Sequence, residues 1–162
     1  LLVDLGAAPG SWSQVALAKL GTKGRVVAVD LLPMAPLPGV HFVQGDFREQ
    51  EVLDRLLLAL GGRKADLVIS DLAPNISGIG VSDQARSMVL CELALEFARQ
   101  CLKPGGSLLV KVFQGAGFTG FLAGMRKAFV KVGSRKPVAS RGRSSEMYLL
   151  GKGFKAGTES RD

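Results

Sequence analysis

Asp4-Leu5-Gly6-Ala7-Ala8-Pro9-Gly10 decides the fold expected for this chain of 162 residues. This stretch begins at the end of the short apolar run 1–5 and precedes a predicted helix at 13–20, so a strand passes through a glycine-containing turn into a helix. In open parallel sheets, ligands bind beyond the carboxyl ends of the strands. The stretch therefore predicts an α/β fold with a ligand site beside the first turn.

Strands and helices continue to alternate along the rest of the chain. Further strands are predicted at 25–30, 40–46, 65–71 and 107–113, and further helices at 49–60, 82–102 and 118–130. Pro104-Gly105-Gly106 is expected to end the longest helix. Alternation of this kind predicts a Rossmann-like, mostly parallel sheet with helices on both faces.

Two weaker strand candidates, 132–137 and 146–151, are separated only by the loop 138–145. This loop is too short for a helical crossover, so we expect these strands to pair antiparallel and to give the sheet one antiparallel edge strand. One domain is expected over 1–153, followed by a polar tail at 154–162. Because the chain begins within a predicted strand, we also expect a preceding segment that this sequence lacks.

Positive charge is concentrated in the last third of the chain. Residues 1–110 carry ten basic and eleven acidic residues, whereas residues 111–162 carry eleven basic and three acidic ones. The net charge is therefore −1 in the first part and +8 in the second. This asymmetry favours a polyanionic partner, most often nucleic acid, over a basic surface that serves only solubility.

Other features exclude several classes of protein. No apolar run approaches the 18 or so residues that span a bilayer, and the first residues lack the basic region of a signal peptide. Cys91 and Cys101 are too far apart for a metal knuckle or a redox pair. We therefore expect an intracellular protein with no metal site and no membrane association.

Acidic residues stand at the ends of three further predicted strands. Asp30, Asp46 and Asp71 end the second, third and fourth strands, as the glycine turn ends the first. Each Asp taken alone is explained better as a turn or helix cap. Four consecutive strand ends with glycine or Asp instead predict one shared crevice.

The glycine turn departs from the dinucleotide-binding fingerprint. Ala8 occupies the position of the glycine that lets a pyrophosphate approach, and Pro9 has no N–H to donate. Asp30 follows Gly10 by 20 residues, a spacing that suits a carboxylate bound to ribose hydroxyls. S-adenosylmethionine fits as a nucleoside without phosphate whose sulfonium is attracted by carboxylates; a nicotinamide enzyme with a degenerate turn remains the alternative.

Two charged residues lie where their type is unexpected. Lys111 interrupts an apolar strand, where it is either buried for function or turned to water on an edge strand. Glu146 lies among arginines and lysines and is either a salt-bridge anchor or a residue that orients a catalytic group.

These segments together resemble the FtsJ/RrmJ family, bacterial heat-shock methyltransferases that modify the ribose 2′-hydroxyl of a uridine in 23S ribosomal RNA. The resemblance covers residues 1–152. It rests on the glycine turn with Trp12 and on the motifs 29–34, 44–47, 70–75, 110–115, 135–137 and 140–148. It implies a seven-stranded S-adenosylmethionine-dependent methyltransferase fold, acting as a monomer in the cytoplasm on ribosomal RNA of the large ribosomal subunit.

The resemblance also implies roles for individual residues. The positions that match the family's cofactor contacts are Gly10, Trp12, Asp30, Asp46 and Asp71. The family's catalytic Lys-Asp-Lys-Glu set matches Asp71, Lys111 and Glu146, and its first Lys would lie upstream of Leu1. Ser11 departs from the usual glycine.

In this scheme Lys111 either accepts the proton of the 2′-hydroxyl as a neutral amine or stays charged and stabilises the developing alkoxide. The expected contacts to RNA phosphates are Lys127, Lys131, Arg135, Lys136, Arg141 and Arg143. Three alternatives stay open: a methyltransferase for a small molecule or for another RNA such as tRNA or an mRNA cap, a non-catalytic RNA-binding assembly factor, and the nicotinamide enzyme.

Overall fold

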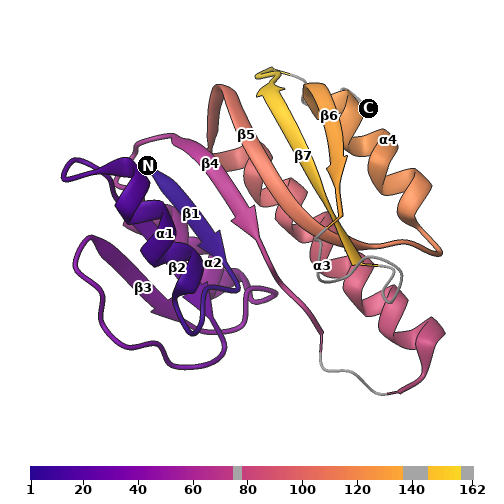
Figure 1. Cartoon of the computed structure of the whole chain (residues 1–162), viewed down its shortest axis with the longest axis horizontal. Coiled ribbons are helices and arrows are strands. Elements are labelled where there is room, and N and C mark those ends of the chain that lie inside the picture. The colour runs from indigo at the N-terminus through magenta and orange to yellow at the C-terminus, as the bar shows by residue number, and fades with distance from the viewer. Residues whose placement is uncertain (75–77, 137–145, 158–162) are drawn as a thin grey trace.

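A single seven-stranded sheet organises the computed structural model, which describes residues 1–74, 78–136 and 146–157. The strand order is β3-β2-β1-β4-β5-β7-β6 (Figure 1). The strands are β1 Leu2–Leu5, β2 Val26–Asp30, β3 Val40–Gln44, β4 Ala65–Ser70, β5 Leu102–Phe113, β6 Phe129–Arg135 and β7 Glu146–Phe154. The helices are α1 Ser11–Leu20, α2 Gln50–Ala59, α3 Gly80–Cys101 and α4 Phe118–Ala128.

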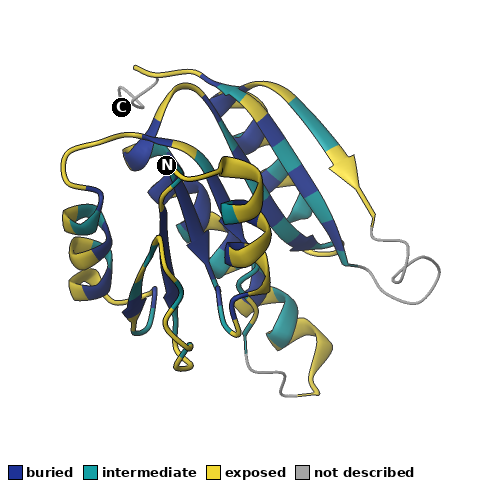
Figure 2. Cartoon of the chain, turned by 60° about the vertical axis from the view of Figure 1, so that its left-hand side comes forward, coloured by how far each residue is buried: buried dark blue, intermediate teal, exposed yellow. Residues whose placement is uncertain are grey.

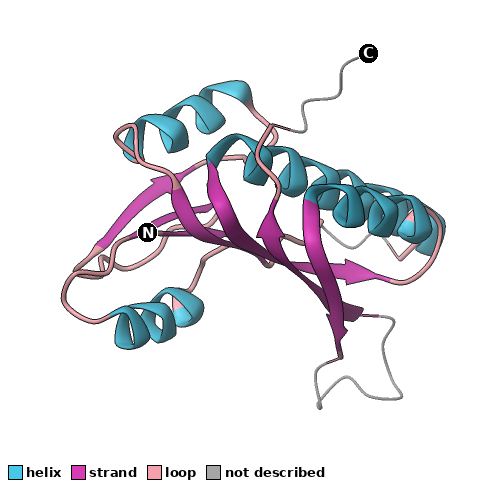
Figure 3. Cartoon of the chain, turned by 90° about the horizontal axis from the view of Figure 1, so that it is seen from above, coloured by secondary structure: helices cyan, strands magenta, loops and turns pink. Residues whose placement is uncertain are grey.

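Helices cover both faces of the sheet, as the alternation in the sequence predicts. Viewed from above, α2, α3 and α4 lie on one face and α1 lies on the other (Figure 3). The larger apolar core joins the sheet to the three helices, with Leu56, Ala94 and Phe121 among its fully buried members. A smaller cluster beneath α1 contains Ala16, Ala28 and Ile69. Buried positions run through the central strands, while the outward sides of the helices are exposed (Figure 2).

The first five strands in the chain are parallel, and β7 is the reversed strand. It lies between β5 and β6 and pairs antiparallel with both. The antiparallel edge predicted from the short loop before residue 146 is therefore confirmed, and it is built from β7 and β6 together.

Side chains alternate regularly across β5 and β7. Leu108, Val110 and Val112 are fully buried against the helices, whereas Lys111 between them points to the opposite face. The register places Lys111 directly opposite Tyr148 of β7, which in turn lies opposite Arg135 of β6. One row of polar side chains thus crosses the antiparallel end of the sheet.

The end of α3 differs from the prediction. The helix ends at Cys101, and Leu102 already pairs with Ala65, so Pro104-Gly105-Gly106 lies within β5 rather than closing the helix. The ladder is interrupted after Leu102 and resumes where Ser107 pairs with Leu67. A bulge of this kind accommodates the extra residues of one strand, which periodicity in a sequence does not reveal.

Among the residues that the structure describes, no helix combines the length and apolar character that crossing a membrane requires.

Gly151 in β7 is predicted to tolerate no side chain. A Cβ there would lie 2.6 Å from Cδ2 and Cγ of Phe129, which is 1% exposed and cannot move away. Gly151→Ala should therefore lower the free energy of unfolding by about 1–3 kcal/mol in urea denaturation. Gly120→Ala is the matched control because it lies in α4 with open space around it, and should raise stability by up to about 1 kcal/mol. Equal effects of the two changes would contradict this packing.

Candidate active site

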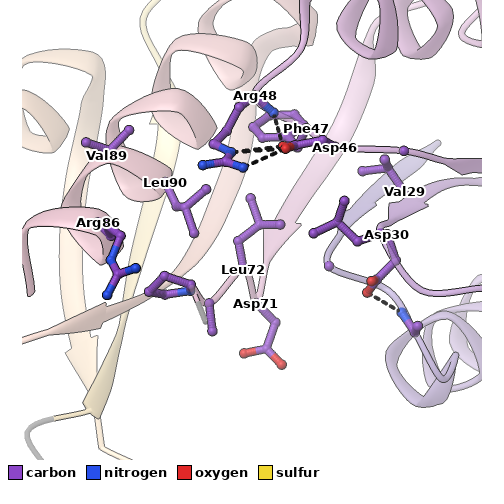
Figure 4. Close-up of a pocket in the computed structure, with 16 residues that line it drawn as sticks. Val29, Asp30, Asp46, Phe47, Arg48, Asp71, Leu72, Arg86, Val89 and Leu90 are labelled. Carbon is purple, nitrogen blue, oxygen red and sulfur yellow. Dashed lines mark hydrogen bonds and ion pairs between the residues drawn. The ribbon is translucent and has the colours of Figure 1, made fainter. Parts of the chain in front are cut away.

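A cavity of about 530 Å³ opens at the carboxyl ends of the parallel strands. Asp30, Asp46 and Asp71 all line it, and Figure 4 shows their carboxylates around the same space. Gly6 and Ala8 contribute the wall formed by the turn after β1. The structure therefore brings four strand ends into one crevice, as their order in the sequence predicts.

The glycine turn is held close to the end of β4. Gly6 adopts φ +79°, and a Cβ there would lie 3.1 Å from the backbone carbonyl of Asp71, so the turn requires glycine for both its conformation and its close approach. The backbone N–H of Ala8 donates to Oδ2 of Asp30 at 2.9 Å. The turn and the end of β2 are thereby tied together across 22 residues of sequence.

Asp30, the last residue of β2, is fixed by two backbone donors. Besides the bond from Ala8, its Oδ1 accepts the N–H of Leu32 at 2.9 Å. These bonds satisfy part of the carboxylate and fix its orientation at the edge of the cavity.

Asp46, just beyond β3, is bound by a single neighbour. Nη2 of Arg48 donates to Oδ2 at 2.7 Å, Nε reaches both oxygens at 3.0 and 3.2 Å, and the Arg48 backbone N–H donates to Oδ1 at 2.9 Å. The hydrogen bonds from Arg48 lower the pKa of the Asp46 carboxyl below its usual value. Asp46 therefore stays ionised at the cavity wall.

Asp71 connects three strands at the other side of the cavity. Its Oδ1 lies 3.1 Å from Nζ of Lys111 in β5 and accepts a hydrogen bond of 3.1 Å from Oη of Tyr148 in β7. The Lys111 side chain is only 13% exposed. Lys111 is thus a largely buried, paired lysine rather than one turned to water, which settles the alternative that the sequence left open.

Tyr148 is the site residue that the sequence failed to single out. Burial raises the pKa of its phenol, and the charges of Asp71 and Glu146 raise it further, so the hydroxyl remains a proton donor. It is separated from Asp71 by 77 residues. Only the register of β5 and β7, which places Tyr148 opposite Lys111, could have revealed it.

Glu146 begins β7 and is opposite Phe113 in the register. Its side chain lies on the same face as those of Tyr148 and Lys111 because positions two residues apart share a face of a strand. The predicted catalytic residues Asp71, Lys111 and Glu146 therefore occupy neighbouring positions at one end of the sheet.

Gly10 and Trp12 lie outside the cavity lining. Gly10 precedes α1 with φ +117°, and Trp12 occupies the first turn of that helix, with its ring centroid 6.4 Å from that of Tyr148. Trp12 thus lies beside Tyr148, the register partner of Lys111. Trp12 is 38% exposed.

Asp4 in β1 is a second residue that the sequence did not assign. It is fully buried, its Oδ2 accepts a 2.7 Å hydrogen bond from Oγ of Ser13, and its Oδ1 has no hydrogen-bond partner among the described residues. Burial, opposed by the bond from Ser13 and reinforced by Asp71 and Asp30, raises its pKa to about 6.

The basic residues expected to contact RNA lie at the antiparallel end. Lys127 lies in the last turn of α4, Lys131 and Arg135 lie on one face of β6, and Lys136 follows. Arg141 and Arg143 lie outside the described residues, as do 75, 137, 140, 142, 144 and 145, which belong to the quoted motifs.

The site combines a glycine turn, three carboxylates and a buried lysine at the carboxyl ends of the strands of a Rossmann-like sheet. This combination is typical of S-adenosylmethionine-dependent methyltransferases. A family comparison is specific: residues 1–154 match the model of the FtsJ-like methyltransferases. The chain therefore belongs to the FtsJ-like methyltransferase family, as its resemblance implies.

Relatives and solved structures agree with this assignment. The chain is 63% identical over 153 residues to "Ribosomal RNA large subunit methyltransferase E" of Chromobacterium violaceum, covering 94% of this chain and 75% of that protein. The protein of the same name from Azoarcus sp. is 62% identical over 151 residues, covering 93% of this chain and 74% of that protein.

Among solved structures, a Plasmodium falciparum protein described as a ribosomal RNA methyltransferase superimposes with a TM-score of 0.81 at 29% identity, covering 94% of this chain and 85% of that one. Human methyltransferase-like protein 13 shares the fold with a TM-score of 0.63 at 16% identity, covering 98% and 72% of the two chains.

Asp4 is predicted to make the stability of the fold depend on pH. An unfolded Asp has a pKa of 3.8, so between about pH 4 and pH 6 the unfolded chain loses a proton that the folded chain retains. Stability should fall as pH rises through this window, by up to about 3 kcal/mol. Asp4→Asn keeps an acceptor for Ser13 but has no charge, so its stability relative to the unmodified chain should increase with pH.

Urea unfolding of both proteins at pH 4.5 and pH 7.5 measures this difference. Asp54→Asn is the control for an exposed carboxylate, at which no comparable change is expected. If the free energies of unfolding of the Asp4→Asn and unmodified proteins change equally with pH, burial does not raise the pKa of Asp4.

Proposed function

We propose that this chain transfers the methyl group of S-adenosylmethionine to the ribose 2′-hydroxyl of a uridine in 23S ribosomal RNA. Relatives 62–63% identical carry the name "Ribosomal RNA large subunit methyltransferase E", and the family is one of methyltransferases. The observation that carries the proposal is the ion pair between Lys111 and Asp71, at 3.1 Å beside the cavity.

The order of the strand ends around the cavity suits an extended S-adenosyl nucleoside. Its strand ends run in the order β3, β2, β1 and β4, which presents Asp46, Asp30, the glycine turn and Asp71 in sequence. A ligand with its sulfonium near Asp71 and its ribose at Asp30 has its base beside Asp46. Gly10 and Trp12 complete the proposed binding residues from the start of α1.

The charges of the crevice suit the cationic cofactor. Carboxylates attract the sulfonium, whereas a pyrophosphate would meet their repulsion. Ala8 and Pro9 add a side chain and remove a donor at the positions where a dinucleotide needs glycine and an N–H. These features argue against the nicotinamide alternative.

Methyl transfer needs the sulfur, the methyl carbon and the attacking oxygen in line. When bound, S-adenosylmethionine would supply an electrophilic methyl group and leave as the neutral thioether, and the 2′-hydroxyl would lose its proton to water as its oxygen takes up the methyl group. The Lys111 amine, held by its ion pair with Asp71, stabilises the negative charge that develops on the oxygen. Asp71 orients the amine, and we assign Glu146 the same supporting role.

The polar row across the antiparallel end supports RNA as the substrate. Lys111, Tyr148 and Arg135 are register partners, and Lys131 lies on the same face of β6 as Arg135. A nucleotide whose ribose lies at Lys111 would extend its backbone phosphates toward these cations. The proposed site is assembled within one copy of the chain, which fits a monomer acting on the large ribosomal subunit in the cytoplasm.

Lys111→Ala is predicted to abolish methyl transfer while S-adenosylmethionine binds with nearly unchanged affinity. The loss should be on the order of 10²–10⁴ in rate, because the amine acts on the hydroxyl and not on the cofactor. Tritiated cofactor with undermethylated ribosomal subunits measures transfer, and calorimetry measures binding. Lys23→Ala is the control, since Lys23 is exposed before β2 at the opposite end of the sheet.

The position of the label tests the substrate. Tritium in a 2′-O-methyluridine of the large-subunit RNA supports the proposal, and tritium in another RNA or nucleotide contradicts the assigned substrate. No transfer by the unmodified chain, with cofactor bound, would favour a non-catalytic assembly factor. Retained transfer by Lys111→Ala would remove the proposed role of the amine.

Charge reversal at β6 should weaken RNA binding and its salt dependence. Lys131→Glu combined with Arg135→Glu removes two phosphate contacts, so the slope of log affinity against log salt should become shallower by roughly 1.5–2. Titration of ribosomal RNA fragments at several salt concentrations measures the slope. Lys23→Glu with Arg63→Glu is the matched reversal at the amino-terminal edge of the sheet and should leave it unchanged.

A further inference from the structure

The pairing of Asp46 with Arg48 involves more hydrogen bonds than the one or two that a simple surface salt bridge makes. Three N–H groups of one residue converge on the Asp46 carboxylate: the backbone N–H, Nε and Nη2. The two residues are only two positions apart, in the turn between β3 and α2. Figure 4 shows the guanidinium lying against the carboxylate at the upper wall of the cavity.

The arrangement leaves one place for a ligand. An ionised carboxylate offers about four lone-pair sites, and the three N–H groups of Arg48 occupy about three of them. Asp46 and Arg48 both line the cavity, with 19% and 62% of their side chains exposed. The remaining acceptor site lies on Asp46, because a guanidinium has hydrogen-bond donors only.

The ligand group that fits this site is an N–H donor. Arg48 prevents the carboxylate from turning and keeps it from becoming protonated, so it cannot itself donate a hydrogen bond. An exocyclic amino group on the base can donate a hydrogen bond to the Asp46 carboxylate. A carbonyl at the same position would instead place its own acceptor oxygen against the carboxylate oxygen. The distinction is the one between adenine and hypoxanthine.

We propose that Arg48 is a positioning residue that fixes Asp46 as an acceptor for the exocyclic amino group of the cofactor's base, and so sets the preference for an adenine nucleoside over its deaminated form. This inference rests on the proposed function, since it uses the placement of the base beside Asp46. Arg48 itself contacts Asp46 and acts through it.

A binding ratio separates this role from simple support of the turn. The probes are S-adenosylhomocysteine and S-inosylhomocysteine, which differ in the group at the base edge, with affinities measured by calorimetry. The unmodified chain should prefer the adenosyl ligand by about 10- to 100-fold, the range expected for a hydrogen bond to a charged group. Asp46→Asn should remove most of this preference.

Arg48→Ala should reduce the adenosyl preference at least about fivefold, because the carboxylate is then free to turn. Arg48→Lys keeps the charge but not the planar fork, so it should recover only part of the preference. Arg55→Ala is the matched control: Arg55 lies on α2, and its Nη1 reaches the carbonyl of Gln44 at 3.5 Å without contacting Asp46. It should leave the ratio unchanged.

The outcomes distinguish this inference from the function on which it rests. If Arg48→Ala weakens both ligands equally and keeps the ratio, Arg48 only supports the turn and the inference is overturned. If the ratio falls for Asp46→Asn but not for Arg48→Ala, Asp46 binds the base without help and the inference is likewise overturned. If the unmodified chain binds neither ligand, the proposed cofactor site itself fails.

Discussion

One carboxylate oxygen connects the parallel part of the sheet with its antiparallel end. Oδ1 of Asp71 accepts the Tyr148 hydroxyl and pairs with the Lys111 amine, so β4, β5 and β7 meet at a single atom. A largely buried lysine needs such a partner, because an unpaired charge at that position would cost several kcal/mol. The antiparallel register of β7 is what makes the contact possible, since it places Tyr148 beside Lys111. The position of the amine therefore depends on how the edge of the sheet is built.

Acidic and basic residues gather in different parts of the sheet. Acidic residues gather at the carboxyl ends of β1 to β4, and the cost of this crowding is visible at Asp4, whose pKa is raised partly by Asp71 and Asp30. A cationic sulfonium relieves that repulsion, and the neutral thioether left after transfer does not. In the proposed complex, the same charges that favour binding of the cofactor thus favour release of its product. Basic residues lie at the other end, where a polyanion can approach without meeting the carboxylates.

Much of this arrangement can be predicted from the sequence because it depends on local pattern. Alternating apolar runs identify the strands, and acids at consecutive strand ends must converge once the strands are parallel. The antiparallel edge follows from the length of the loop before residue 146. The bulge in β5 could not be predicted, since Pro104-Gly105-Gly106 reads equally well as a helix stop. Tyr148 and the contact of Ser13 with Asp4 were missed because a hydrogen bond between distant segments depends on register and packing, which residue types do not encode.

The contacts that hold each functional carboxylate differ in range, and this difference has a consequence. Asp46 is fixed by a residue two positions away, and Asp30 by Leu32 and by the glycine turn. These contacts form within the β1 to β3 part of the sheet. The Lys111 amine depends on partners contributed by β4 and, through Tyr148, by β7. Disturbance of the β6–β7 edge should therefore misplace the lysine proposed to act on the hydroxyl while the proposed cofactor crevice keeps its shape, so cofactor binding and methyl transfer should be separable properties of one sheet.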